Sequence, residues 1–300
     1  MNLTKLLLLE QYLTENSAKP RFSVPFLTRK NTHNVELQNW KDYQDLRKGT
    51  ITIRQSGIRV KSPDYYPCLT YNPVIPIIYE SGYRYLNQQE LLALQSFPPN
   101  YQFPTNYSLS KIASLLGNSI NLEALRYFLR DKSISNLKFI DLFSGLGAFH
   151  LTLKGLGNEC VLALDQNKSC QATYQLNFSD TPFLLGNIND KDIQKKVIQQ
   201  EFDLLCAGFP CQPFSKAGKK TGQSLELTSL LTIIKKKQPL YLLLETVPHF
   251  CQSSGTNELL FLLLSDYQIQ MSIINPKDLA VKQNRPRLFI WGQRNFKLYE

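Results

Sequence analysis

Four short apolar segments in the C-terminal half constrain the fold more than any other feature of the sequence. They are residues 137–143, 160–165, 202–208 and 239–245. Segments of this length and composition are typical of buried parallel strands, and stretches of helical length separate them. They predict an α/β fold with a mostly parallel sheet. In such sheets, ligands bind at the carboxyl ends of the strands.

The sequence before these segments has a different pattern. Apolar residues recur at helical spacing through residues 109–130, which predicts a helix with a possible break at 117–118, and residues 131–137 form a polar link. Residues 1–80 contain several prolines and scattered β-type segments. We therefore expect a small, β-rich and irregular domain over 1–80 and a larger domain over 81–300.

The chain carries a net charge of +10. A surplus of this size is typical of proteins with an anionic partner, most often nucleic acid, although a basic protein without such a partner has the same charge. Residues 1–75 hold 11 Lys/Arg and 6 Asp/Glu, so a quarter of the chain carries half of the surplus. This favours the N-terminal quarter as a phosphate-facing surface.

The cysteines and the N-terminus bear on the compartment. None of the six cysteines forms a C-x-x-C pair and there are three histidines, so we expect no metal site. Reduced cysteines in apolar runs fit a reducing compartment. Glu10 interrupts the first apolar run well short of a signal peptide or a membrane span, so we expect a cytoplasmic protein with no membrane partner.

A glycine-rich turn follows the first predicted strand. Gly145 and Gly147 lie in FSGLGAF, where glycines let a ligand approach the backbone and the next helix offers free N–H groups. Asp165 ends the second apolar segment, where a carboxylate can accept both ribose hydroxyls. Together they predict a nucleoside-containing cofactor, although tight turns also need glycine. NAD-binding sequences more often have a third glycine.

Cys211 follows the segment 202–208 in GFPCQPFSK, and Glu245 ends the next apolar segment. If the two strands are neighbours, a thiol nucleophile and an acid of raised pKa open into one cleft. Alternatively, Cys211 packs in a turn and Glu245 caps a helix. Arg285 and Arg287 precede the last apolar segment and could point at one anion or carbonyl, or form a solvated basic edge.

The segments FSGLGAF, GFPCQPFS, LLLETV and QNRPR together resemble the cytosine-carbon-5 DNA methyltransferases. Pro-Cys-Gln after a strand is the specific part of this resemblance, since it matches the family's nucleophile loop. Residues 83–103 and 109–120 resemble the two blocks that come last in most members but precede the first strand here. The resemblance implies a circularly permuted order, with the C-terminal-type motifs in 81–131 and the cofactor and catalytic motifs in 137–300.

The resemblance implies a Rossmann-like S-adenosylmethionine-dependent methyltransferase sheet with helices on both faces, plus a small β-rich or irregular target-recognition domain over residues 1–80. It also implies a mechanism on a cytosine that is rotated out of duplex DNA. Cys211 attacks carbon 6, Glu245 holds or protonates ring nitrogen 3, and carbon 5 takes the methyl group. Arg287 would hold the base carbonyl, and Arg285 would support the loop or a nearby phosphate.

By the same resemblance, two further sets of residues are expected to bind ligands. Those expected to bind S-adenosylmethionine are Phe143, Ser144, Gly145, Leu146, Gly147, Asp165, Asn187, Pro210, Asn118 and Ser119. Those expected to contact double-stranded DNA are Arg54, Arg59, Lys61, Gln212 and Ser215. Phe143 would lie against the adenine. A restriction-modification role is expected, with a cognate restriction endonuclease as functional partner and room for a second subunit that completes target recognition.

The sequence departs from the family pattern at several positions. Ala148 replaces a glycine, Asn187 replaces the usual Asp, and Thr246 replaces the Asn that usually follows the acid. The stretch after Cys211 is also shorter. Two alternatives remain open: a catalytically silent DNA-binding or regulatory relative, and an RNA cytosine methyltransferase, against which Gln212 argues.

Overall fold

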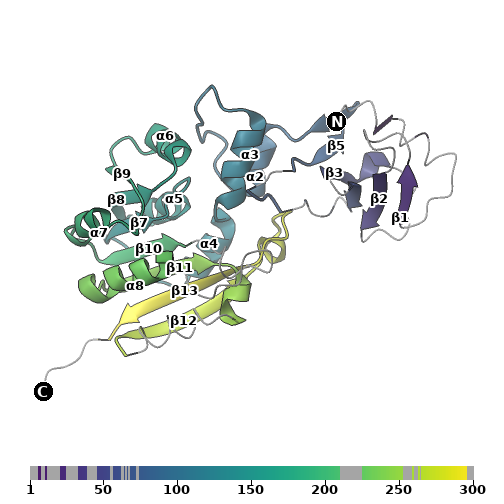
Figure 1. Ribbon diagram of the computed structural model, residues 1–300. Helices are drawn as coiled ribbons and strands as arrows, with labels where there is room; N and C mark the ends of the chain where they lie inside the picture. The colour runs from purple at the N-terminus through teal and green to yellow at the C-terminus, as the bar shows by residue number, and fades with distance from the viewer. Residues whose placement is uncertain are drawn as a thin grey trace, which may run out of the picture. The chain divides into compact units, whose positions relative to one another are not determined.

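The protein divides into two compact units. A computed structural model describes residues 6–7, 11, 21–24, 33–38, 46–54, 57–61, 64, 66, 68–71, 74–209, 225–252, 259, 263 and 265–295. The first unit consists of Met1–Pro99, Tyr107–Asn118 and Ala280–Asn284, and the second of Asn100–Asn106, Ser119–Leu279 and Arg285–Glu300. Figure 1 shows the helices and strands of both.

In the described part of the first unit, six strands form one sheet. In spatial order they are β1 (Arg21–Val24), β2 (His33–Gln38), β4 (Gly57–Lys61), β3 (Thr50–Arg54), β5 (Ile77–Tyr79) and β6 (Tyr83–Tyr85). A short 3-10 helix, η1 (Leu46–Lys48), precedes β3. Ile51 lies opposite both Val60 and Ile77, and all three are fully buried. The apolar residues therefore share one face, as the two-residue period of strands requires.

The same unit contains the described helices α2 (Gln88–Leu94) and α3 (Leu109–Asn118). Gln95, at the end of α2, is fully buried and donates from Nε2 to the carbonyl of Leu116 in α3 at 2.8 Å. This hydrogen bond joins the helices side by side. The first compact unit runs through Pro99, so α2 belongs to it. The division of the chain into a target-recognition domain over 1–80 and a catalytic domain over 81–300 stays a prediction.

In the second unit, seven of the described strands form another sheet. Their spatial order is β12 (Tyr267–Ile274), β13 (Arg287–Arg294), β11 (Tyr241–Thr246), β10 (Leu204–Gly208), β7 (Lys138–Leu142), β8 (Glu159–Asp165) and β9 (Phe183–Leu185). From β11 to β9 all neighbours are parallel, and β13 and β12 are antiparallel. The four predicted strands are confirmed as β7, β8, β10 and β11, and the chain changes direction across the sheet between β7 and β10.

Helices cover both faces of this sheet, which confirms the predicted α/β class. Among the described residues, the helices of the unit are α4 (Leu122–Leu129), α5 (Ala148–Gly155), α6 (Lys168–Asn177), α7 (Lys191–Ile198) and α8 (Leu225–Lys237), with the 3-10 helices η2 (Pro248–Gln252) and η3 (Pro276–Leu279). Val197 of α7 and Leu230 of α8 share a buried cluster with Leu205 of β10. On the other face, Phe128 of α4 stacks on Phe289 of β13 with ring centroids 5.3 Å apart.

The predicted helix over 109–130 is two helices, α3 and α4. The break follows from Asn121, whose Oδ1 accepts hydrogen bonds from the backbone N–H groups of Glu123 and Ala124, both at 3.1 Å. Such a side chain starts a new helix because it satisfies N–H groups that lack a helical partner. The chain passes from the first unit to the second at this break.

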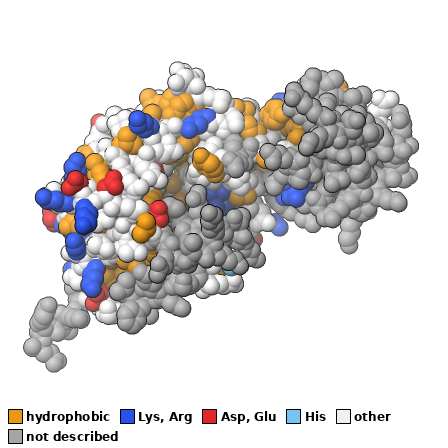
Figure 2. Space-filling model, in the orientation of Figure 1, with side chains coloured by type: hydrophobic (Ala, Val, Ile, Leu, Met, Phe, Trp, Pro, Cys, Tyr) orange, Lys and Arg blue, Asp and Glu red, His pale blue; other side chains and the backbone are white. Residues whose placement is uncertain are grey.

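Basic side chains gather at one edge of the second unit. Figure 2 shows Lys and Arg side chains where α7 and α8 lie, and the last turns of these helices contain Lys195, Lys196, Lys235, Lys236 and Lys237. Cations at helix C-termini interact favourably with the helix dipole. These lysines therefore have a structural explanation, and they lie away from the carboxyl ends of the parallel strands. Among the described helices, none is long and apolar enough to cross a membrane.

Candidate active site

The turn between β7 and α5 has an unusual backbone. Phe143, Gly145 and Gly147 have φ values of +57°, +54° and +74°. A left-handed bulky residue such as Phe143 is an outlier that often marks a functional site. A Cβ added to Gly147 would come within 2.5 Å of the Phe178 ring and 2.9 Å of the Tyr174 ring, so only glycine fits. The sequence therefore builds a tight loop at the carboxyl end of β7.

Asp165 closes this loop from the neighbouring strand. Its Oδ2 accepts a hydrogen bond from the backbone N–H of Gly145 at 2.9 Å, and its Oδ1 accepts one from that of Asn167 at 2.8 Å. Burial raises the pKa of Asp165, and these N–H groups oppose the shift because they stabilise the carboxylate. The Gly186 N–H donates to the Asp165 carbonyl at 3.1 Å, which places Asn187 next to this strand end.

The loop fits a nucleoside-containing cofactor. Helix α5 begins at Gly147 without a side-chain cap, so its first N–H groups face the turn. Within the described residues, the buried hydroxyl of Ser144 has no hydrogen-bond partner. N–H donors at a helix N-terminus and a hydroxyl suit an anionic group of a ligand, and the Asp165 carboxylate can accept hydrogen bonds from ribose hydroxyls.

Glu245 lies at the carboxyl end of β11, opposite Gly208 of β10. It is 8% exposed, and its Oε1 lies 3.0 Å from Nε of Arg287. Burial raises the pKa of Glu245, while the positive charges of Arg287 and then Arg285 oppose the shift. Burial therefore favours the protonated carboxyl of Glu245, and the two neighbouring arginines favour the carboxylate.

Arg285 contacts a different group from Arg287. It lies just before β13, is 4% exposed and donates from Nη2 to the carbonyl of Ser119 at 3.1 Å. Its backbone N–H donates to Oδ1 of Asn275 at 2.9 Å. The structure thus places Arg287 on the acid and Arg285 on the backbone that follows the break between α3 and α4.

Some of the expected site residues are not brought together by the described geometry. Cys211, Pro210, Gln212 and Ser215 lie outside the described residues. Asn118 ends α3 in the first unit, and Ser119 is the first residue after it in the second.

The expected DNA-contacting residues Arg59 and Lys61 belong to β4 of the first unit. Arg59 lies opposite Thr52, and Lys61 lies opposite Thr50. Both side chains therefore lie on the face of the sheet opposite that of Ile51 and Val60. Both are partly buried. Arg54 lies in β3, and its side chain is outside the described part of the chain.

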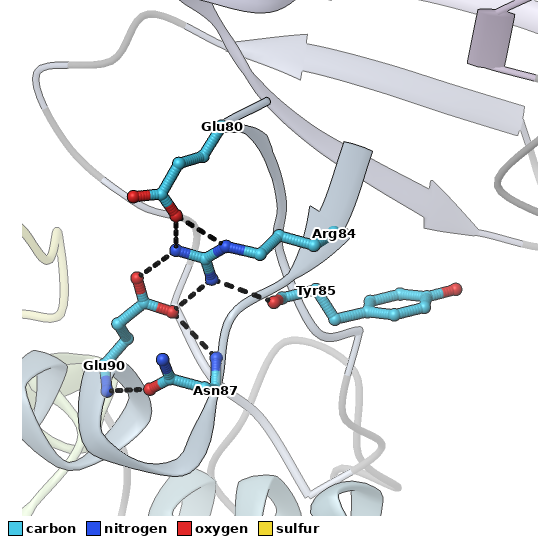
Figure 3. A network of polar contacts seen from close by, with 5 residues as sticks. All are labelled: Glu80, Arg84, Tyr85, Asn87 and Glu90. Carbon is cyan, nitrogen blue, oxygen red and sulfur yellow. Dashed lines mark hydrogen bonds and ion pairs between the residues drawn. The ribbon is translucent and has the colours of Figure 1, made fainter. Parts of the chain in front are cut away.

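A polar network that the sequence did not single out fixes the start of α2 (Figure 3). Arg84 donates to Oε2 and Oε1 of Glu90 at 2.8 and 2.9 Å, and from Nε to Glu80 at 2.8 Å. Asn87 and Glu90 form a reciprocal capping box. Hydrogen bonding to Arg84 lowers the pKa of Glu90. The resemblance at residues 83–103 contained the signal, since Arg84 and Glu90 both fall within it.

Tyr101 is a second residue that the sequence did not single out. Its hydroxyl is buried and donates to the carbonyl of Leu146 at 2.6 Å, so it holds the loop between β7 and α5 from outside. Tyr101 and Leu146 are 45 residues apart in the sequence. Both belong to the second unit, which contains residues 100–106. Within the described residues, no group of three or more His, Cys, Asp or Glu side chains could hold a metal ion.

Comparison with known proteins places these features in a family. The model of the family C-5 cytosine-specific DNA methylase matches residues 3–132 and 137–299. Type II methyltransferase M.HhaI of Haemophilus parahaemolyticus is 34% identical over 175 residues, which cover 56% of this chain and 52% of that protein. Type II methyltransferase M.MspI of Moraxella sp is 30% identical over 245 residues, which cover 79% of this chain and 54% of that protein. The chain spans about half the length of the curated relatives it matches.

Among solved structures, the crystal structure of the S. pombe Dnmt2 methyltransferase is 24% identical with a TM-score of 0.48, and the match covers 54% of this chain and 52% of that one.

Proposed function

The chain belongs to the C-5 cytosine-specific DNA methylase family, and we propose that it transfers a methyl group from S-adenosylmethionine to carbon 5 of cytosine in double-stranded DNA. The observation that carries this proposal is the buried pair of Glu245 and Arg287 at the carboxyl edge of the sheet. Glu245 lies opposite Gly208, which precedes Cys211 by three residues in the sequence. An acid at the end of the strand next to the one that leads to a thiol suits attack on a base ring.

The loop between β7 and α5 is the proposed cofactor site. When bound, S-adenosylmethionine supplies a methyl group that is activated by its positively charged sulfur. Asp165 would accept the ribose hydroxyls, since its carboxylate is already fixed by two backbone N–H groups. Phe143 would lie against the adenine. Asn187 would hydrogen-bond near the adenine without adding charge.

The chemistry on cytosine would begin at Glu245. Because burial raises its pKa, the carboxyl can donate a proton to ring nitrogen 3 and make carbon 6 electrophilic. The Cys211 thiolate would then add to carbon 6, and carbon 5 would take the methyl group as its bond to the sulfonium sulfur breaks and S-adenosylhomocysteine leaves. Carbon 5 would finally lose its proton to water as the bond between Cys211 and carbon 6 breaks, and ring nitrogen 3 would return its proton to Glu245. Chain connectivity alone keeps the Cα of Cys211 within about 11 Å of that of Gly208.

We also propose that the chain is a circular permutation of the family's usual order. The family model matches in two segments that are interrupted between residues 132 and 137. In the second unit, α4 packs against α5, so a link of a few residues suffices to join α4 to β7. New chain ends are tolerated where they open in surface loops, and a short link then closes the old ones.

The partners follow from the relatives, which are named as Type II methyltransferases. We propose that this chain serves a cytoplasmic restriction-modification system, with cleavage by a cognate endonuclease. Arg54, Arg59 and Lys61 of the first unit would contact DNA, since this region holds half of the positive surplus. We also propose that a second subunit completes target recognition.

The test is a covalent trap. Purified protein is incubated with S-adenosylmethionine and duplex DNA in which 5-fluorocytosine replaces cytosine, because fluorine cannot leave as a proton does. We expect an adduct that survives denaturation, is lost in Cys211→Ser and persists in the control Cys251→Ser, whose thiol is free and exposed. Absence of the adduct despite DNA binding would contradict the proposal and favour a silent relative. Trapping on RNA alone would favour an RNA enzyme.

A further inference from the structure

Two of the places where the chain passes between units are joined by a hydrogen bond. The chain enters the second unit between Asn118 and Ser119 and again between Asn284 and Arg285. Nη2 of Arg285 donates to the Ser119 carbonyl at 3.1 Å, across 166 residues of sequence. Ser119 and Arg285 are the first residues of the second unit after these two crossings, and they are hydrogen-bonded to each other.

Arg285 is fixed at its backbone as well as at its side chain. Its N–H donates to Oδ1 of Asn275, which directly precedes η3, and the residue is 4% exposed. A guanidinium this deeply buried is held in one place, and hydrogen bonds from a charged group are stronger than neutral ones. Such a residue can fix the positions of two chain segments relative to each other.

The segment that Arg285 holds also borders the acid. A Cβ placed on Gly208 would lie 3.6 Å from Oε2 of Glu245 and 3.6 Å from Cδ1 of Ile120. Ile120 directly follows Ser119. The residue after the one that Arg285 holds therefore lies beside Gly208, as the Glu245 carboxyl does. The positive charge of Arg285 also acts on the Glu245 carboxyl.

We propose that Arg285 is a positioning residue that holds the Ser119 turn (residues 118–121) against the start of β13. It thereby fixes this turn, which includes the expected cofactor-binding residues Asn118 and Ser119, relative to the Glu245 carboxyl. It acts through these groups and does not contact DNA phosphate. The effect of Arg285 on the reaction rests on the proposed function. Its effect on the order of the Ser119 turn does not. Arg287, which pairs with Glu245, has the separate role described above.

The experiment compares three full-length variants with the parent protein. Arg285→Gln removes the charge, and Arg285→Lys keeps it while losing the planar donor geometry. Arg294→Gln is the matched control, because Arg294 also donates from Nη1 to a backbone carbonyl, that of Gln238, at the other end of β13. Hydrogen exchange is followed by mass spectrometry on peptides that contain residues 118–121.

We expect amide exchange at 118–121 to rise at least about tenfold in Arg285→Gln, to rise less in Arg285→Lys, and to stay unchanged in Arg294→Gln. A tenfold change corresponds to the loss of about one hydrogen bond. Unchanged exchange in both Arg285 variants would overturn the inference. If Arg285→Gln does not fold, Arg285→Lys alone decides, since its exchange must still exceed that of Arg294→Gln.

Binding separates this role from a phosphate contact. We expect the Kd for S-adenosylmethionine, measured by calorimetry, to rise about tenfold in Arg285→Gln, with an unchanged salt dependence of DNA binding. If the slope of DNA affinity against salt instead falls by about one and cofactor binding is unchanged, Arg285 holds a phosphate and the inference is wrong. These readouts need no turnover, so a parent protein that fails to methylate cytosine refutes the proposed function separately.

Discussion

The ion pair of Glu245 and Arg287 makes a pH-dependent contribution to stability that Arg287→Met would reveal. The side chains are 10% and 19% exposed and 3.0 Å apart, so solvent screens them little. Removing one partner of a buried pair costs about 3–5 kcal/mol when the other stays charged. In Arg287→Met the remaining carboxylate can escape this cost only by taking up a proton.

The sign of the pH effect follows from the direction of the pKa shift. Burial already raises the pKa of Glu245. Of the two arginines that lower this pKa, Arg287 has the larger effect, so its loss raises the pKa further. A carboxyl whose pKa is higher in the folded state adds stability that is present in full below its unfolded pKa. That stability is lost as the pH rises through the folded pKa, by up to about 1.4 kcal/mol per pH unit. Arg287→Met should therefore be destabilised more at pH 8 than at pH 5.5.

Urea unfolding measures this difference. The chain has two tryptophans, and Trp291 lies buried in β13 with Arg287, so a Trp40→Phe background leaves a reporter in the same strand. We expect a loss of about 3–5 kcal/mol at pH 8 and a clearly smaller one at pH 5.5. Adding Glu245→Gln should abolish the pH dependence. Equal destabilisation at both pH values, or a pH dependence that survives Glu245→Gln, would refute the reasoning.

Three further substitutions test other parts of the structure. Gly147→Ala places a methyl group against the Phe178 ring at positive φ and should cost about 1–3 kcal/mol in thermal unfolding; an unchanged Tm would contradict the loop geometry. Tyr101→Phe should cost about 0.5–1.5 kcal/mol, because the Leu146 carbonyl loses its donor; equal stability would mean that water replaces it. Arg59→Glu should weaken DNA binding and flatten its salt dependence, and unaltered binding by fluorescence anisotropy would remove Arg59 from the interface.

The sheet of the second unit was largely predictable because burial on both faces requires continuous apolar sequence. The strands β7, β8, β10 and β11 are such segments. Strand β9 has three residues, all only partly buried, and therefore carries no comparable signal. The division into units could not be read either, since the first unit combines three segments that are far apart in the sequence.

The candidate site was predictable where a residue's place in its strand determines where the side chain lies. Asp165 and Glu245 end apolar segments, which is enough to place them at the carboxyl edge of a parallel sheet. The contact of Arg285 was not predictable, because its partner Ser119 is 166 residues away in the sequence. The alternation of residues on a strand suggested a common target for Arg285 and Arg287, but Arg285 lies before the strand begins.

Three carboxyls lie on one face of the sheet, and their surroundings separate their roles. Asp141 is fully buried between Cys206 and Ala163, so burial raises its pKa well above its usual range and the His150 N–H opposes this only in part. Asp165 is held by backbone N–H groups that favour the carboxylate, which suits it to accept hydrogen bonds from hydroxyls. Glu245 alone of the three combines burial with two nearby arginines, so it can hold a proton and also bear the charge that remains after giving it away. In the proposed function, proton transfer to the base is therefore assigned to Glu245.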